Sequence, residues 1–151
     1  MSRRKRNIRI MSLMVTVIMF FSSCSAQPQP ITYGTDQCDL CKMAIIDERF
    51  GAELVTKKGK VYKFDSGECM INYLRHEKVK KDEVASLWVV SPAEPRKLID
   101  ATQAFYLHSE KFPSPMGAFL SAFESEEQLK QFRDQYSGEV WTWEEAMKQV
   151  K

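Results

Sequence analysis

The chain has 151 residues, enough for one domain and hardly for two. Lys and Arg number 22 against 20 Asp and Glu, a formal net charge of +2, but five of the basic residues and no acidic residue lie within the first 23 positions. The remaining residues therefore include 17 Lys and Arg against 20 Asp and Glu, a net charge of −3. This mildly acidic charge excludes the basic surface that nucleic-acid binding requires.

The N-terminus has the pattern of an export signal. Residues 2–9 are basic, and residues 10–21 form an apolar stretch that is too short to span a bilayer comfortably but is typical of a secretory signal. Small residues directly before Cys24 resemble a bacterial lipobox. We therefore predict a signal peptide at 1–23 and a lipid on Cys24 that anchors the protein to a bacterial membrane, facing the periplasm or the cell exterior. The alternative is an ordinary signal peptide cleaved after Ala26.

The segment 24–35 is rich in Gln, Pro and Ser and predicts a short flexible tether, followed by one domain at 36–151. With Cys24 assigned to lipid, Cys38, Cys41 and Cys69 remain. An odd number of cysteines in an exported protein implies at least one free or metal-bound thiol. A scaffold held together only by disulfides is therefore not expected.

In the first half of the domain, strand-like sequence occurs at 44–46, 49–56, 61–64 and 86–90. The lysine- and glycine-containing stretch 57–60 predicts a hairpin turn. Asp65 or Ser66 is expected to cap a helix that runs to about Arg75, with Met70 on its apolar face.

The second half repeats this order. Strand-like sequence occurs at 97–99, 104–107, 117–123 and 139–142, with a capped helix from Ser125 to about Tyr136 and a short helix at 143–150. The pattern Phe-acidic-Ser-x-Glu-x-apolar-x-x-aromatic begins at Phe64 and again at Phe123, 123 − 64 = 59 residues later. We therefore expect an α+β fold in which two related ββαβ units pack as one small domain.

Two thiols and a thioether lie close together at Cys38, Cys41 and Met43. Such soft ligands favour Cu(I) over hard cations. A redox dithiol or disulfide stays open, although such a motif is expected at the start of a helix after a strand. Zinc also stays open, although a structural site needs four ligands and the mature chain has neither a second Cys-x-x-Cys nor a closely spaced pair of histidines.

Other candidates are weaker. Met116 lies between Pro115 and Gly117 in a predicted loop, where a metal-ligand role and a core role are both open. Cys69 fits a buried small hydrophobe better than a ligand. His108 is a candidate auxiliary ligand.

Together these features resemble the NosL family, the lipoprotein accessory factors of nitrous oxide reductase. The resemblance is carried by the lipobox at Cys24, the Cys38-x-x-Cys41-x-Met43 motif, the helix start at 64–66, and the segment 114–123. It spans essentially the whole mature chain. It implies a fold shared with organomercurial lyase and a periplasmic copper chaperone without catalytic activity.

By position, the resemblance implies that Cys41, Met43 and Met116 bind Cu(I), with Cys38 a possible fourth ligand. It also implies delivery of copper for the copper–sulfur centre of nitrous oxide reductase, together with an ABC-type assembly complex. Lys42 stands where the family often has Gly. The alternative is an enzyme, either a thiol–disulfide oxidoreductase that uses Cys38 and Cys41 or a thiol-dependent lyase in which Cys69 is the second thiol.

Overall fold

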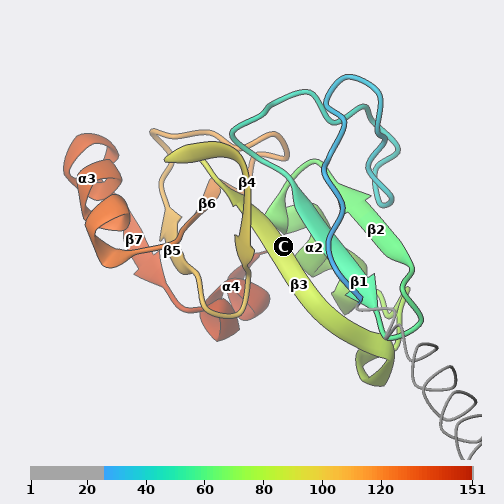
Figure 1. Ribbon diagram of the computed structural model, residues 1–151. Coiled ribbons are helices and arrows are strands. Elements are labelled where there is room, and N and C mark those ends of the chain that lie inside the picture. Colours follow the sequence, from blue (N-terminus) through green and yellow to red (C-terminus); the bar gives the residue numbers. More distant parts are fainter. Residues whose placement is uncertain (1–25, 151) are drawn as a thin grey trace, which may run out of the picture.

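The computed structural model describes residues 26–150 as a small α+β domain with two antiparallel sheets and three α-helices (Figure 1). The predicted signal peptide and the proposed lipid site at Cys24 lie outside the described residues. No helix within the described range is long and apolar enough to cross a membrane.

The first sheet has the strand order β2-β1-β3-β4. Its strands are β1 (Ala52–Thr56), β2 (Val61–Phe64), β3 (Val84–Ser91) and β4 (Glu94–Asp100). Helix α2 (Gly67–Arg75) follows β2 and lies behind this sheet in Figure 1, and a 3₁₀ turn (Lys81–Glu83) leads into β3.

All five residues of β1 are buried. Leu54 belongs to the core that also contains residues of α2. Residues of the predicted tether cover the opposite face of β1. The backbone N–H of Gln29 donates to the Glu53 carboxylate at 2.8 Å, and the Tyr33 hydroxyl donates to the Phe50 carbonyl at 3.0 Å. Part of the segment predicted as a tether therefore packs against the first sheet.

The second sheet has the strand order β6-β5-β7. It consists of β5 (Phe105–His108), β6 (Leu120–Phe123) and β7 (Glu139–Trp141). Helix α3 (Glu126–Tyr136) packs on β5 and β6, and α4 (Trp143–Gln149) ends the described chain. Because β3 contacts β6 and α2 also contacts β6, the two halves share one interior.

The structure confirms the internal repeat. In each half the first strand lies between the second strand and the strand that follows the helix, so β2-β1-β3 corresponds to β6-β5-β7. Both helices begin after a serine in extended conformation whose hydroxyl accepts from the backbone three residues later, Ser66 from Cys69 and Ser125 from Gln128. The echo in the sequence is thus a repeated strand-to-helix junction.

Three details of the prediction are wrong. The stretch 44–46 forms only an isolated bridge, between Ala44 and Gln37, rather than a strand. The stretch 97–99 lies in β4, which pairs with β3 of the first sheet and so does not start the second unit. The strand expected from 117 begins only at Leu120, because Phe119 has a positive φ of 58° that breaks extended structure.

Candidate metal centre

Four potential ligands converge at the start of α2. The side-chain ligand atoms of Cys38, Cys41, Asp65 and Cys69 all lie within 4.8 Å of one another. The three thiols are free. The four residues come from three places: a loop before the first sheet, the end of β2, and the first turn of α2.

The loop is a tight turn that brings Cys38 and Cys41 together. The backbone N–H of Lys42 donates to the Cys38 carbonyl at 2.9 Å, and the N–H of Cys38 donates to the Met43 carbonyl at 2.8 Å. Lys42 has a left-handed backbone with φ of 66°, a conformation that glycine adopts without steric cost. A glycine at position 42, as the resemblance described above implies, would therefore fit this turn without steric cost.

Two backbone contacts hold the loop against β2. The N–H of Asp39 donates to the Lys63 carbonyl at 2.8 Å, and the N–H of Lys63 donates to the Asp39 carboxylate at 2.9 Å. Since Asp65 lies only two residues beyond Lys63, this pairing brings the loop thiols to the Asp65 carboxylate. The Cys41 thiol lies 3.5 Å from that carboxylate.

The helix cap positions the third thiol. The Ser66 hydroxyl accepts from the N–H of Cys69 at 3.4 Å, which fixes Cys69 in the first turn of α2. Met70 points instead into the core and is fully buried, as predicted. The sequence predicted either Asp65 or Ser66 as the helix cap, and the structure shows that Ser66 is the cap. The Asp65 carboxylate lies instead beside the three thiols.

The three thiols differ in acidity. The neighbouring Cys69 thiol and backbone hydrogen bonds lower the pKa of Cys38 to about 6, in spite of its burial. Burial, the thiol of Cys38 and the charge of Asp65 raise the pKa of Cys41 to about 11. The interaction with Cys38, together with burial, raises the pKa of Cys69 far above its ordinary value. Cys38 is therefore the most acidic of the three thiols.

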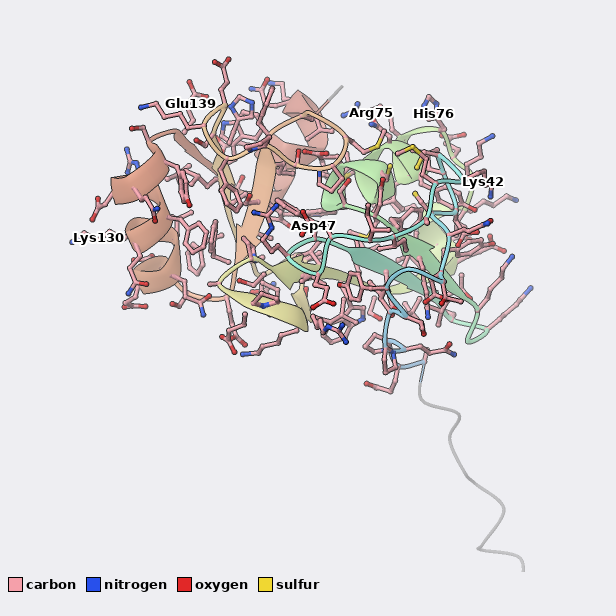
Figure 2. All side chains as sticks on the ribbon, turned by 90° about the horizontal axis from the view of Figure 1, so that it is seen from above. Lys42, Asp47, Arg75, His76, Lys130 and Glu139 are labelled. Atoms are coloured by element: carbon pink, nitrogen blue, oxygen red, sulfur yellow. The ribbon has the colours of Figure 1, made fainter. Side chains whose placement is uncertain are left out.

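The cluster is accessible from one side. Cys38 and Cys69 are 0% and 1% exposed, whereas Cys41 is half-buried. Met43 is 53% exposed and Met116 is 41% exposed, so solvent and a partner can reach both thioethers. In Figure 2 the sulfur atoms, drawn in yellow, gather near Lys42 beside α2.

The loop that carries Met116 is tied to α2 through one buried carboxylate. Glu68 accepts from the Ser114 hydroxyl and, at 3.0 Å, from the N–H of Leu120. The Ser114 hydroxyl in turn accepts from the N–H of Phe119 at 2.9 Å. The Met116 loop is thus held to the residue that directly precedes Cys69.

His108 contacts aromatic residues and not the thiol cluster. Its ring stacks on Trp141 at 4.4 Å between ring centroids and meets Phe119 edge-on. It is not a member of the ligand cluster found among residues 26–150.

The structure brings two of the four predicted ligands into one cluster. Cys38 and Cys41 are brought together as expected, while the ligand roles of Met43 and Met116 stay predictions. Cys69 and Asp65 were not expected to join them. The available signal was the odd thiol in the first turn of a capped helix, together with an acidic residue directly before the cap. The number of ligands does not exclude zinc, because the fold supplies four candidate ligands.

Fold and centre together define a small α+β protein built from two ββαβ units, with a thiol-rich cluster able to hold a soft metal ion. The chain belongs to the NosL family, which it matches over residues 29–150. The family is one of metallochaperones rather than enzymes.

A solved structure supports this assignment. The chain is similar to the copper chaperone NosL from Shewanella denitrificans, whose crystal structure it matches with a TM-score of 0.66 and 26% sequence identity. The match covers 80% of this chain and 95% of that one. Among curated proteins, no significant match was found.

Proposed function

We propose that this protein is a membrane-anchored chaperone that binds Cu(I) and delivers it for assembly of the copper–sulfur centre of nitrous oxide reductase. The observation that carries the proposal is the convergence of three free thiols in a member of the NosL family. The solved relative is itself described as a copper chaperone.

The ligand chemistry favours Cu(I) held by Cys38 and Cys41, completed by Met43 and Met116. Thiolate and thioether sulfurs are the soft ligands that Cu(I) prefers, whereas a carboxylate such as Asp65 suits harder ions. Cys69 keeps its proton most strongly of the three thiols, so we assign it the role of hydrogen-bond donor to Cys38. In this role it stabilises the thiolate that receives the metal.

The exposure of the predicted ligands suits transfer. Cys38 is buried, Cys41 is half-buried, and both methionines are more than two-fifths exposed. A partner protein can therefore reach the methionines and Cys41 while Cys38 still holds the ion. Copper would then leave by exchange of one ligand at a time, without release into water.

The family and the N-terminal sequence support a proposal for the anchor and the partners. A lipid on Cys24 would keep the domain at a bacterial membrane, facing the periplasm or the cell exterior. The partners would be nitrous oxide reductase and its ABC-type assembly complex.

A thiol–disulfide oxidoreductase is the weaker alternative. Such an enzyme needs an accessible thiol with a lowered pKa. Here the thiol with the lowered pKa, Cys38, is 0% exposed, and the accessible Cys41 has a raised pKa. The motif also lies in a turn that leads toward β1 rather than at the start of a helix.

Competition titration of the full-length protein in detergent against a Cu(I) chelator tests the proposal. We expect one Cu(I) per chain and loss of tight binding in the double variant Cys38→Ser, Cys41→Ser. A parallel titration with Zn²⁺ should show that Cu(I) displaces zinc. If zinc binds and Cu(I) does not displace it, the centre is a zinc site and the copper assignment fails.

A further inference from the structure

One end of the first sheet carries a concentration of exposed lysines. It comprises the turn between β1 and β2 and the connection between α2 and β3. Six exposed lysines lie on these two segments, at Lys57, Lys58, Lys60, Lys78, Lys80 and Lys81. Three exposed acidic residues accompany them, Glu77, Asp82 and Glu83, so the net charge is 6 − 3 = +3. We call this surface the lysine face.

The two segments form one continuous surface. The backbone N–H of Lys57 donates to the Glu83 carbonyl at 2.8 Å, and Thr56 pairs with Val84 where β1 meets β3. Within residues 26–150, no carboxylate forms an ion pair with any of the six lysines. The lysine face is thus a positively charged patch on a domain whose overall charge is negative.

The described chain begins at this same end. Ile31 packs against Gly51, and Gln29 bonds to Glu53, so the leading segment runs antiparallel to β1. This direction carries the start of the described chain toward the end of β1 that leads into Lys57. Figure 1 shows the blue start of the described chain at the end of β1 where the turn to β2 begins.

The proposed anchor is close to this end along the chain. Cys24 precedes Ala26 by two residues, which span at most about 7 Å of extended chain. Resting on the lipid anchor proposed above, we propose that the lysine face lies on the anionic phospholipid surface of the membrane to which Cys24 is attached.

The chemistry of the two signals is complementary. A lipid fixes the chain to the bilayer but not its orientation, whereas clustered lysines beside an anchor are attracted by anionic headgroups. This attraction acts within a Debye length, about 10 Å at 0.1 M salt, so only the end nearest the membrane contributes. The other lysines of the domain are not needed for it.

The orientation has a consequence for the metal centre. Cys69 lies in the first turn of α2 and Arg75 ends that helix next to the lysine face. Cys69 precedes Arg75 by 75 − 69 = 6 residues, so the two residues lie about 9 Å apart along the helix axis at about 1.5 Å per residue. With the lysine face on the membrane, the thiol cluster is held away from the bilayer and open to a partner protein.

The test uses the full chain, processed by its host, purified in detergent and reconstituted in vesicles. The vesicles contain phosphatidylcholine alone or phosphatidylcholine mixed with phosphatidylglycerol. Acetylation of each lysine by an amine-reactive reagent is followed by mass spectrometry, which also reports the lipid on Cys24. Lys130, an exposed residue of α3 in the second half of the domain, lies outside the lysine face and is the internal control.

We expect several-fold slower acetylation of Lys57, Lys58 and Lys81 on the anionic vesicles, reversed by high salt, with Lys130 unchanged. The double variant Lys57→Gln, Lys81→Gln should lose the protection of the remaining lysines. The matched variant Lys111→Gln, Lys130→Gln should keep it.

The failures are distinguishable. A chain without lipid on Cys24 refutes the anchoring in the proposed function and this inference with it. A lipidated chain whose lysines react equally on both kinds of vesicle refutes the inference alone. Protection that appears only when an acidic partner protein is added would also overturn it, because the lysine face would then be a protein-binding surface.

Discussion

Glu68 and Ser114 join the two halves of the candidate metal centre. The hydroxyl of Ser114, in the loop that carries Met116, donates to the buried carboxylate of Glu68, which directly precedes Cys69 in α2. Glu68 is the counterpart of Glu127 in the repeat, and Glu127 is exposed. The same position of the strand-to-helix junction is therefore exposed in the second unit, whereas in the first unit its glutamate holds the Met116 loop of the second unit.

Replacing Glu68 should weaken this connection. In Glu68→Ala the buried N–H of Leu120 and the hydroxyl of Ser114 lose their acceptor, so we expect a loss of about 1–3 kcal/mol in the free energy of unfolding. If Met116 binds copper, Cu(I) affinity should also fall by about ten- to a hundredfold, as for residues that orient metal ligands. Urea unfolding and Cu(I) titration measure the two effects.

Glu127→Ala is the matched control, and its effect on stability should stay within about 0.5 kcal/mol. Unchanged Cu(I) affinity in a folded Glu68→Ala protein would remove the Met116 loop from the centre.

The ligand set itself can be separated by sulfur deletion. Met43→Ala and Met116→Ala should each weaken Cu(I) binding, because each removes a soft donor. Cys69→Ser should leave affinity within severalfold of the wild type, since the serine hydroxyl still donates to Cys38. The same chelator competition measures all three variants. A collapse of affinity in Cys69→Ser, with normal binding in both methionine variants, would move the copper to the buried cluster.

Lys42 is expected to make the loop less stable than glycine would at the same position. A non-glycine residue in left-handed conformation costs about 1–2 kcal/mol, partly offset because glycine loses about 0.5–1 kcal/mol more entropy on folding. Lys42→Gly should therefore leave stability unchanged or raise it by about 1 kcal/mol. Lys42→Val should lower it, because a β-branched residue is poorly tolerated at positive φ. Thermal unfolding of both variants tests this, and equal Tm values for them would contradict the strain.

The buried carboxylate of Glu53 should make stability depend on pH. Burial raises its pKa from 4.5 to about 7, so the folded protein binds this proton more tightly than the unfolded chain. Its contribution to stability is then favourable below about pH 4.5 and is lost as the pH rises to about 7. The total change is up to about 3 kcal/mol, from 1.36 kcal/mol for each unit of pKa.

Glu53→Gln removes that titration while its amide oxygen still accepts from Gln29. Urea unfolding at pH 5 and pH 8 should show that the variant gains stability relative to the wild type as the pH rises. An identical pH dependence of the two proteins would show that Glu53 has an ordinary pKa in the folded state.

The sequence predicted the fold where local signals decide it. The caps at Ser66 and Ser125 and the turn at 57–60 were correct because serine caps and glycine turns act through their nearest neighbours. The pairing of β4 with β3 was missed although only two residues separate these strands. The prolines at positions 92 and 95 were interpreted as the end of a strand, whereas an edge strand such as β4 tolerates proline.

The same limit applied to the metal centre. The proximity of Cys38 and Cys41 is local and was predicted from spacing. Their approach to Asp65 and Cys69 depends on the hydrogen bond between Asp39 and Lys63, which are 24 residues apart. A local sequence pattern does not predict such a contact. A buried cysteine in a helix looks the same in the sequence whether it packs or faces a cluster.

Transfer of copper to the reductase can be followed in one reconstitution. The Cu(I)-loaded protein is incubated in membranes with the ABC-type assembly complex and copper-free nitrous oxide reductase, and the copper–sulfur centre is followed by its absorption spectrum and by enzyme activity. We predict that the wild type restores the centre and that Cys38→Ser, Cys41→Ser does not. Equal restoration by both proteins, or by free copper alone at the same concentration, would contradict the account.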